Sequence, residues 1–474
     1  MENSGQSNNN EFLVLSDLHL ADVEDNKDGW MYYKSSRFLY DRDLYDLVDR
    51  FERSALNRKA EPVLVLNGDI FDFDLITAYP KNKEFKVSLF EKWRGLHANS
   101  KKSAWKLGRI LDNHPIFCEA LALFLSRGHK VVYVLGNHDR EFHFDEVKQV
   151  FLKRLSVIAT GLGLEKGKLE VEFRPWFYYV PGAIYVEHGQ QYDHYTSFRY
   201  VLEPTVRIGR EERLALPMGN LSNRYLMTKM GFFNPHASDF ILNLYSYFTH
   251  WVKYYAFSIR GLAINWFLGS LVVMGKLLRI RNKLLSKPPD MKALMQRESA
   301  TAGLEITVLQ KLAALQRAPI TSRFFRILRE FWIDRLLLGG LMATGTVVLA
   351  LVPIPLWIKL MVPLSAFPLA YFIYEWAIQG ENIHTFEKNL PDIAGKIAKL
   401  LDVKVVAFGH THRPRMVPLG RNTVFANTGT WAPVTFGPPP GRLKQGLRNF
   451  LHLRFEGAEP IVKLGSEMDL DGGT

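Results

Sequence analysis

The feature that most constrains this fold is a series of short apolar segments, each followed by a cluster of polar residues. The segments cover residues 12–15, 63–66, 131–135, 183–186, 405–408 and 423–426. Continuous apolar runs of this length are typical of buried strands. Helical patterns lie between the early segments, for example over residues 37–50 and 115–126. Strands that alternate with helices predict an α/β domain, in which ligands bind at the carboxyl ends of the strands.

Five polar clusters fall at these predicted strand ends. They are Ser16-Asp17-Leu18-His19, Asn67-Gly68-Asp69-Ile70-Phe71-Asp72, Gly136-Asn137-His138-Asp139, Glu187-His188-Gly189 and Gly409-His410-Thr411-His412. Taken singly, each cluster has an ordinary explanation, such as a turn or a surface polar pair. Five of them in succession make coincidence implausible and predict one shared site.

The residue types in these clusters are those of a metal site. Asp and His are ligands for borderline divalent ions such as Mn²⁺, Fe²⁺ and Zn²⁺. On an extended strand end, residues i and i+2 point to the same side, so we expect both members of DxH and of HxH to reach one site. An Asn carbonyl is a neutral oxygen ligand, and a carboxylate can bridge two ions that together clamp a phosphoryl group. The glycines allow sharp turns beside the ions.

The middle of the chain has a different character, because long stretches of it are apolar. Residues 336–374 contain a single charge, Lys359, and Pro353 and Pro355 divide this run into two halves. As helices the halves would each span roughly 26–29 Å, close to the thickness of a bilayer core. Pro363 and Pro368 weaken the second half. The pattern predicts a helical hairpin that enters a membrane, and the alternative is a buried helical core inside a large insert.

The positive charge is concentrated just before this hairpin. The whole chain carries a net charge of +12, and residues 251–335 hold 15 Lys and Arg against 5 Asp and Glu. Basic and apolar residues are interleaved there, which favours an interfacial membrane segment at about 240–275 over a nucleic-acid groove. The positive-inside rule predicts that the basic end, and with it the domain that carries the polar clusters, lies on the cytoplasmic side. Cys118 is the only cysteine, so an intrachain disulfide is excluded.

The five clusters in this order resemble the motifs of the calcineurin-like metallophosphoesterase superfamily. The resemblance covers about residues 11–195 and 400–435. It implies an α/β fold, a four-layer αββα sandwich in which two mixed sheets are flanked by helices. We therefore expect a short disordered lead over 1–10, a catalytic domain formed by 11–195 and 400–465, and a large helical, partly membrane-embedded insert over 196–399.

The resemblance also implies a role for each matched residue. One metal ion would be held by Asp17, His19 and His412. The other would be held by Asn137, His188 and His410. Asp69 would bridge the two ions, and a metal-bound hydroxide would attack phosphorus. We expect two divalent ions, with Mn²⁺ favoured over Fe²⁺ and Zn²⁺.

Five further residues near these ligands have expected roles. The resemblance makes His138 a proton donor to the leaving oxygen or a stabiliser of phosphate charge, and Asp72 is placed to orient it. Asp139 is expected to have a structural role in its loop. Arg140 is a candidate for bidentate binding of a substrate phosphate, with a surface salt bridge as the alternative. Asp193 is a second candidate for substrate binding.

Within the superfamily, several motifs look like the branch that contains UDP-2,3-diacylglucosamine pyrophosphatases, which are peripheral membrane enzymes. The matching stretches are Asp17-Leu18-His19-Leu20, Gly68-Asp69-Ile70-Phe71-Asp72, His188-Gly189-Gln190-Gln191-Tyr192-Asp193, Gly409-His410-Thr411-His412-Arg413-Pro414 and Asn427-Thr428-Gly429-Thr430-Trp431. Two features depart from that branch. Many of its members carry Arg where this chain has His138, and the stretch of about 220 residues between His188 and His410 is far longer.

The branch implies a substrate class and leaves alternatives open. A lipid-linked phosphoester or pyrophosphate beside a membrane is the expected substrate, and nucleic acid is not expected. A hydrolase of soluble nucleotides or phosphodiesters with a membrane anchor is one alternative. A membrane-associated scaffold with a vestigial metal site is another.

Overall fold

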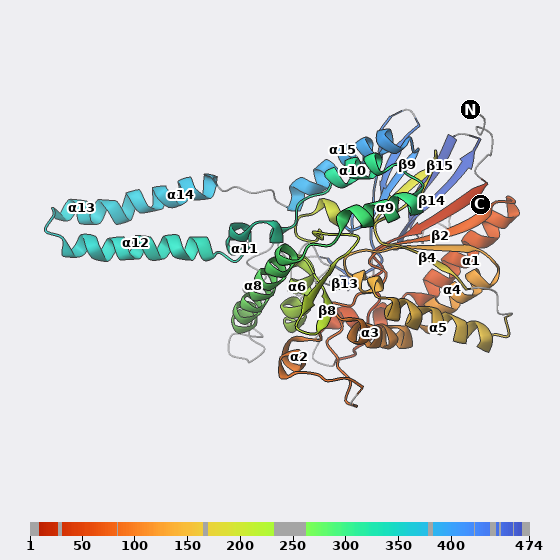
Figure 1. Cartoon of the computed structure of the whole chain (residues 1–474), viewed down its shortest axis with the longest axis horizontal. Coiled ribbons are helices and arrows are strands. Elements are labelled where there is room, and N and C mark those ends of the chain that lie inside the picture. Colours follow the sequence, from red (N-terminus) through yellow and green to blue (C-terminus); the bar gives the residue numbers. More distant parts are fainter. Residues whose placement is uncertain are drawn as a thin grey trace.

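The structure is a computed structural model and describes residues 9–26, 31–82, 84–164, 169–231, 262–377, 383–420, 422–436, 442–444, 447–457 and 459–466. Figure 1 shows a body of stacked sheets and helices from which a long helical hairpin projects. Most of the predicted lead (residues 1–8) and the first part of the predicted interfacial segment (240–261) lie outside the described residues.

The first sheet has six strands in the order β15-β14-β1-β2-β3-β4. These strands are β1 (Asn10–Leu15), β2 (Glu61–Asn67), β3 (Lys130–Val134), β4 (Val171–Arg174), β14 (Asn449–Glu456) and β15 (Glu459–Ser466). The strands β1 to β4 run parallel, so their carboxyl ends meet at one edge. The late strand β14 pairs antiparallel with β1 and thereby joins the two ends of the chain.

The second sheet has five strands in the order β10-β11-β9-β6-β5. These strands are β5 (Phe177–Val180), β6 (Ile184–Glu187), β9 (Val405–Phe408), β10 (Arg415–Pro418) and β11 (Val424–Asn427). Its three central strands, β6, β9 and β11, are parallel. Two further two-stranded sheets are described, β7 (Thr205–Ile208) with β8 (Glu211–Leu214), and β12 (Val434–Phe436) with β13 (Arg442–Lys444).

Alternation along the strands explains why the two sheets stack between helices. Phe12 and Val14 of β1 pack with Val186 of β6 and Val405 of β9 in a core between the sheets. Successive side chains of a strand point to opposite faces, so Leu13 and its neighbours of the same parity face helices instead. The helices over the first sheet include α1 (Asp41–Asn57), α3 (Ser100–Asn113), α4 (Pro115–Ser126) and α5 (Asp145–Gly161). Those over the second include α9 (Met291–Ala302), α10 (Ile306–Ala314) and α15 (Ile383–Leu401).

The α/β prediction is therefore confirmed, with layers in the order helix, sheet, sheet, helix. Each predicted strand corresponds to an observed one within one or two residues, and the predicted helix over 115–126 coincides with α4. The stretch after residue 195, which the sequence assigned to a helical insert, begins with strands β7 and β8 and helix α6 (Met218–Tyr225). Leu216 and Leu221 of this stretch are buried in the same core as α3 and α5, so it packs as part of the domain.

Helix α8 (Leu262–Ser286) contains the described part of the predicted interfacial segment and is only half exposed. Val273, Leu277 and Ile280 are buried against the domain, beside α6. The first turns of α8 instead expose apolar side chains, including those of Trp266 and Phe267. A single helix thus has one face in the core of the domain and an apolar face in solvent.

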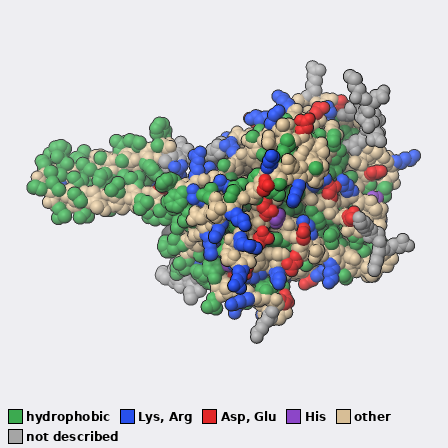
Figure 2. All heavy atoms as spheres, in the orientation of Figure 1, with side chains coloured by type: hydrophobic (Ala, Val, Ile, Leu, Met, Phe, Trp, Pro, Cys, Tyr) green, Lys and Arg blue, Asp and Glu red, His purple; other side chains and the backbone are tan. Residues whose placement is uncertain are grey.

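The predicted hairpin is present and projects from the body next to α11 (Phe324–Glu330). Helix α12 (Ile333–Leu351) forms one arm, and α13 (Leu356–Met361) and α14 (Phe367–Ala377) form the other, joined by a π-helical turn over Val362–Ala366. Both arms are long and apolar enough to cross a membrane by length and composition, and none of their residues is buried. Figure 2 shows apolar side chains over the whole projection. The alternative, in which this segment forms a buried helical core, does not agree with its exposure.

The second arm, in which Pro363 and Pro368 were expected to bend or break a helix, stays helical over Leu356–Ala377. A wider π-helical turn contains Pro363, and this change of hydrogen-bonding pattern accommodates the missing amide donor. The base of the hairpin is closed by an ion pair in which Nε of Arg335 lies 2.6 Å from Oε1 of Glu375. At the tip, the Lys359 ammonium donates to the Ala350 carbonyl oxygen at 2.8 Å. The charges of the projection are thus located at its base and near its tip.

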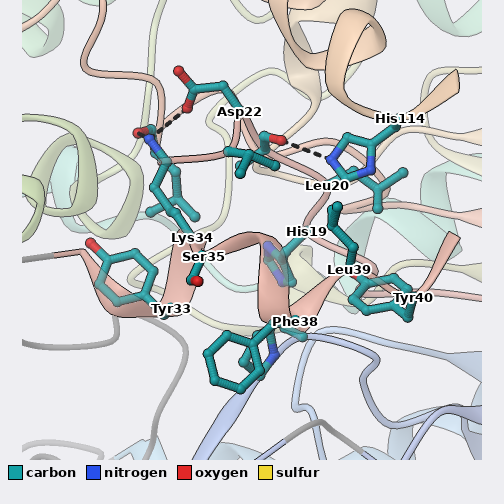
Figure 3. A pocket seen from close by; sticks show the side chains of 15 residues that line it. His19, Leu20, Asp22, Tyr33, Lys34, Ser35, Phe38, Leu39, Tyr40 and His114 are labelled. Atoms are coloured by element: carbon teal, nitrogen blue, oxygen red, sulfur yellow. Dashed lines mark hydrogen bonds and ion pairs between the residues drawn. The ribbon is translucent and has the colours of Figure 1, made fainter. Parts of the chain in front are cut away.

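The loop that follows β1 covers the carboxyl edge of the first sheet. It encloses a cavity of about 50 Å³ that reaches His19 and is lined by Tyr33, Lys34, Phe38 and Tyr40, among others (Figure 3). The Lys34 ammonium lies 2.5 Å from a carboxylate oxygen of Asp22. This small cavity adjoins the edge at which the polar clusters gather.

Candidate metal centre

All seven predicted ligands follow the carboxyl ends of parallel strands in the two stacked sheets. Asp17 and His19 follow β1, Asp69 follows β2, Asn137 follows β3, His188 follows β6, and His410 and His412 follow β9. Because β1, β2 and β3 neighbour each other in one sheet, and β6 and β9 in the other, the five clusters converge. The convergence predicted from the sequence is what the topology produces.

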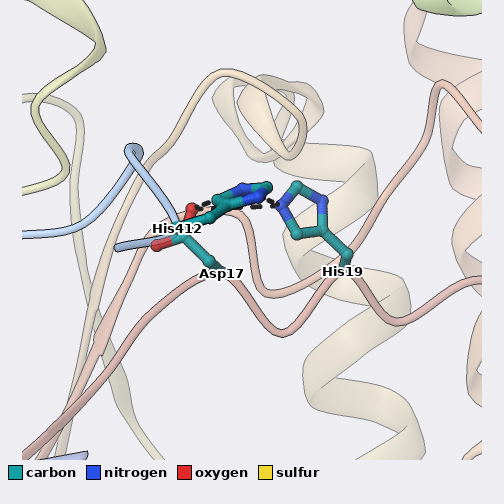
Figure 4. A group of neighbouring side chains, drawn as sticks. All are labelled: Asp17, His19 and His412. Atoms are coloured by element: carbon teal, nitrogen blue, oxygen red, sulfur yellow. Dashed lines mark hydrogen bonds and ion pairs between the residues drawn. The ribbon is translucent and has the colours of Figure 1, made fainter. Parts of the chain in front are cut away.

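One group of side chains brings Asp17, His19 and His412 together (Figure 4). The Nε2 atoms of the two histidines lie 3.0 Å apart, and Nε2 of His412 lies 3.2 Å from Oδ1 of Asp17. Asp17 and His19 are buried, and His412 is partly exposed. Two imidazole nitrogens and a carboxylate oxygen thus face one point, as a metal site requires.

A second group brings Asp69, His188 and His410 together. Nε2 of His188 lies 3.0 Å from Oδ2 of Asp69, and the same Oδ2 lies 4.0 Å from Nε2 of His19 in the first group. One carboxylate therefore lies between the two groups. The resemblance implies this position for the bridging ligand.

Asn137 supplies a test of whether this second group fits a cation. Its side-chain Oδ1 is buried and accepts no hydrogen bond from the residues that the structure describes. Its Nδ2 donates to Oδ1 of Asn220 at 3.3 Å, which fixes the orientation of the amide. A buried carbonyl oxygen without a donor costs free energy, and coordination of a cation would satisfy it. The residues present therefore fit two divalent ions.

The histidines are oriented by partners on their other ring nitrogens. Nδ1 of His188 lies 2.8 Å from the Asn67 carbonyl oxygen, and Nε2 of His410 lies 3.4 Å from Oδ2 of Asp193. A partner on one nitrogen fixes the tautomer and directs the other nitrogen toward the metal. The Asp193 carboxylate is consequently placed to orient His410, and its predicted contact with substrate stays a prediction.

The carboxylates at the centre are held in the deprotonated form that binds metals. Burial alone would raise the pKa of Asp17, but the neighbouring His188 and His412 lower it to about 2. Burial likewise opposes the charge on Asp69, and His188 and His138 nevertheless hold the pKa of Asp69 well below its ordinary value. The pKa of His188 is depressed by burial and raised more strongly by Asp69 and Asp17, to about 9.

Backbone geometry at the ligands differs from the expected extended strand ends. Five ligand residues have a left-handed backbone, with φ of 53° at Asp17, 49° at His19, 53° at Asp69, 70° at His410 and 59° at His412. The two members of each pair meet because the chain turns twice, and the simple i, i+2 argument for a strand does not apply. Such a conformation costs free energy for a residue with a Cβ, and it is often found at functional sites.

Glycines make room for this packing at two positions. A Cβ on Gly136 would lie 2.2 Å from Oδ1 of Asp69, and one on Gly409 would lie 2.5 Å from Oδ2 of Asp17. Neither distance is compatible with a methyl group. The glycines in the GN and GH motifs are therefore needed because the carboxylates lie directly against the backbone.

His138 lies beside the ligand groups and contacts two carboxylates. Its Nδ1 is 3.1 Å from Oδ2 of Asp72 and 3.4 Å from Oδ2 of Asp74. The same Oδ2 of Asp72 lies 3.0 Å from Nδ1 of His19. Burial lowers the pKa of His138, but Asp72 and Asp69 outweigh burial and hold it well above its ordinary value. Asp72 thus contacts both His138 and the predicted ligand His19, and its role in orienting His138 stays a prediction.

Asp139 has the structural role that was predicted for it. Its carboxylate accepts from the backbone amides of Ile70 and Gly136, at 2.9 and 2.7 Å, and from the Tyr133 hydroxyl at 2.6 Å. It therefore ties together the loops after β2 and β3. Burial raises the pKa of this carboxyl to about 6.

Arg140 does not have the exposed position that either of its predicted roles requires. Its side chain is fully buried, donates to the Pro175 carbonyl oxygen at 2.5 Å and lies over the ring of Phe198. The surface salt bridge is therefore wrong, because the guanidinium is in the interior. Binding of a substrate phosphate stays a prediction that this burial does not support.

Further polar residues, which the sequence did not indicate, hold the loop after β3. Asn220 of α6 donates to Oδ2 of Asp74 at 2.6 Å and to the Asn137 carbonyl oxygen at 3.0 Å. Arg224, one turn later, pairs with Asp74 at 2.7 Å and with Glu141 at 2.5 Å. The spacing of Asp72 and Asp74 was visible in the sequence, whereas nothing there connected α6 with the site.

The residues around Trp431 support the first ligand loop from the other side. The Asp17 carbonyl oxygen accepts from the Thr430 hydroxyl at 2.9 Å and from the Trp431 amide at 3.1 Å. The Asn427 side chain donates to the Gly409 carbonyl oxygen at 2.6 Å. The NTGTW stretch thus fixes the loops that carry Asp17 and His410.

Comparison with known families agrees with this geometry. Residues 11–216 match the family model described as calcineurin-like phosphoesterase, and the match ends close to α6. The comparison with curated proteins found no match. The matched stretch carries five of the seven residues of the centre, and His410 and His412 come from the part of the chain after it. Residues 11–216 therefore match a calcineurin-like phosphoesterase domain, and that family consists of metal-dependent hydrolases that act on phosphoester bonds.

Proposed function

We propose that the protein is a dinuclear-metal phosphoesterase that hydrolyses a phosphoester or pyrophosphate bond in a lipid-linked or membrane-associated substrate. The observation that carries the proposal is the position of Asp69 between two sets of nitrogen and oxygen donors. Two divalent ions held there would supply Lewis acidity for the phosphoryl oxygens and activate a water molecule. We expect Mn²⁺ to serve best, with Fe²⁺ and Zn²⁺ as alternatives.

The residues of the chain itself would position the substrate and move the proton. His138 is buried beside the centre, and its Nδ1 contact with Asp72 keeps the ring in one orientation. This orientation makes Nε2 the nitrogen that would reach a leaving-group oxygen. Burial lowers the pKa of His138, but Asp72 and Asp69 outweigh burial and raise it well above its ordinary value. A protonated imidazole suits a general acid.

The exposed apolar hairpin supports a membrane location for the substrate. Trp332 and Trp376 lie at the base of the projection and are largely exposed. Tryptophans favour the interface between lipid and water, so the apolar arms would enter the bilayer while the domain rests at its surface. Arginines precede the hairpin, and by the positive-inside rule we expect this domain on the cytoplasmic side. The resemblance to UDP-2,3-diacylglucosamine pyrophosphatases makes a lipid pyrophosphate the first substrate to test.

A second candidate is a hydrolase of soluble nucleotides or phosphodiesters that uses the hairpin only as an anchor. The observation that favours it is the direction of the hairpin, which extends away from the body and reaches the domain through α11 (Figure 1). A scaffold with a vestigial metal site is less well supported, because all seven donor residues and His138 are present and converge.

The substrate class can be tested by product analysis. Purified protein in detergent with Mn²⁺ would be offered UDP-diacylglucosamine, a phospholipid diester, a cyclic nucleotide and a soluble aryl phosphodiester. We expect UMP to be released from the lipid-linked sugar at a rate far above the turnover of the soluble compounds. Turnover of only the soluble phosphodiesters would reject the lipid substrate and favour the anchored hydrolase.

The metal assignment has a matched pair of variants. Asp69→Asn removes the shared negative charge and is expected to abolish both metal uptake and activity. Asp402→Asn makes the same chemical change at an exposed residue that also has a left-handed backbone, with φ of 50°, so it should behave as wild type. Wild-type activity and metal content in Asp69→Asn would reject the two-metal centre.

The membrane location is tested separately from the chemistry. Deletion of residues 336–374 removes the apolar arms and should move the protein from the membrane fraction to the soluble fraction with its activity on a soluble phosphodiester intact. A deleted protein that stays with the membrane would show that the hairpin is not the anchor.

A further inference from the structure

A cavity larger than the one beside His19 lies between the catalytic domain and α8. It has a volume of about 320 Å³, within the range of roughly 300–1,000 Å³ that is typical of small-molecule sites. Much of its lining is apolar, with Leu221 and Tyr225 of α6 facing Leu271 and Val272 of α8. None of the metal-ligand residues lines it.

Three cationic side chains line the same cavity, namely Arg213, Lys276 and Arg279. The Lys276 ammonium lies over two aromatic rings, 4.7 Å from the centre of Phe90 and 4.3 Å from that of Tyr225. Over the described ranges, no carboxylate forms an ion pair with Lys276 or Arg279. Arg213 pairs with Glu211 at the surface. Within the part of the chain that the structure describes, the cavity therefore combines apolar walls with two cations, Lys276 and Arg279, that form no ion pair with a carboxylate.

The surroundings of Lys276 disfavour the charged form of its side chain. Burial lowers the pKa of Lys276 to about 7, and the positive charges of Arg213, Arg224 and Arg279 contribute to the shift. A bound anion would favour the charged form of Lys276, because it would supply a counter-charge inside a poorly hydrated space. Each of these cations would therefore attract an anionic ligand in the cavity.

We propose that this cavity binds a single-chain amphiphilic anion, with its carboxylate or phosphate on Lys276 and Arg279 and its apolar chain between α6 and α8. Charge complementarity fixes the sign of the head group, and the leucine and valine walls require an apolar tail. The exposed apolar turns at the start of α8 offer a path from a lipid surface.

The site is separate from the metal centre but shares one helix with it. Asn220 and Arg224 of α6 contact Asn137 and Asp74 at the centre, whereas Leu221 and Tyr225 of the same helix line the cavity. Binding at the cavity therefore does not require a working centre. The two proposals can fail independently.

Photo-crosslinking tests the location directly. The full chain in phosphatidylcholine nanodiscs would be labelled with a decanoate that carries a diazirine on its chain, and the labelled peptides would be identified by mass spectrometry. Competitors would be decanoate, decyl phosphate, inorganic phosphate and decanol. Lys276→Met removes the charge and keeps the stem, and Lys283→Met, at an exposed position of the same helix, is the matched control.

The expected result is labelling within 218–225 and 262–286 that decanoate and decyl phosphate suppress. Loss of one charge-assisted contact in Lys276→Met should weaken binding by about tenfold or more, and Lys283→Met should bind as wild type. Asp69→Asn should also bind as wild type, which separates this site from the proposed hydrolase.

Equal labelling of the Lys276→Met and Lys283→Met variants would overturn the proposal. Competition by decanol that is as strong as competition by decanoate would also overturn the proposal. Competition by inorganic phosphate alone would reduce the site to one for free phosphate and reject the amphiphile.

Discussion

Replacement of Gly136 by Ala gives a test of the centre that leaves every ligand in place. A Cβ at this position would lie 2.2 Å from Oδ1 and 2.5 Å from the amide nitrogen of Asp69, whereas ordinary contacts begin near 3.4 Å. Gly136 has no left-handed backbone, so the effect is one of space rather than of backbone strain. The added methyl group therefore displaces the Asp69 carboxylate by about 1 Å.

A displacement of that size has a large consequence for a bridging ligand. Misplacement of a catalytic group by about 1 Å can cost about 10²-fold in rate. The same shift disturbs the hydrogen bond from the His138 amide to Oδ1 of Asp69, which is 2.7 Å long. We expect Gly136→Ala to lose about 10²-fold in kcat and to retain less than the full complement of metal.

The assay combines the rate on a soluble aryl phosphodiester with metal content by mass spectrometry and a thermal unfolding curve. Gly108→Ala is the control, because a Cβ on Gly108 in α3 meets nothing within 4 Å. That variant should be fully active and more stable by about 0.5–1 kcal/mol, as expected for Ala in place of Gly in a helix. A folded Gly136→Ala protein with wild-type metal content and rate would refute the reasoning.

Three other predictions concern single residues. His138→Ala should keep its metal and lose about 10²–10⁴-fold in rate, the usual effect of losing a general acid; loss of metal instead would show that His138 is a ligand. Arg224→Met leaves two buried carboxylates without their shared partner and should lower the free energy of unfolding by about 3–5 kcal/mol, which an unchanged melting temperature would contradict. Burial raises the pKa of Glu11, but hydrogen bonds, first from His452, outweigh burial and lower it from 4.5 to about 2. The stabilisation by Glu11 is therefore complete above pH 4.5 and is lost as the pH falls toward 2, so thermal unfolding of Glu11→Gln should approach wild type in that window, while the exposed control Glu61→Gln shows no such trend.

The sequence predicts the framework of this protein well because its signals are local. The strand over residues 405–408 and the helix over 115–126 are runs whose period and flanking residues determine their type, and both coincide with observed elements. The ligand clusters could be placed at one edge because parallel strands have a common direction. Neither inference needs knowledge of how distant segments pack.

The parts that could not be predicted depend on contacts between distant segments. Asn220 and Arg224 support the centre only because α6 packs against the loop after β3, some 80 residues earlier in the chain. The left-handed backbone of Asp17 and His19 is also imposed by surroundings, since neither residue type demands it. The interior position of Arg140 follows from the packing of Phe198 over it, which no local pattern indicates.

The place of β9 and β14 in chain order has a consequence for biosynthesis. Strand β9 lies between β6 and β11, and β14 lies beside β1, yet both are synthesised after the hairpin. His410 and His412 follow β9, so the nascent chain lacks two of its seven donor residues until the apolar arms have left the ribosome. Because translation proceeds from the N-terminus, the arms can reach a membrane before the centre can form. The order of the chain thus lets the apolar arms emerge before the donor set of the centre is complete.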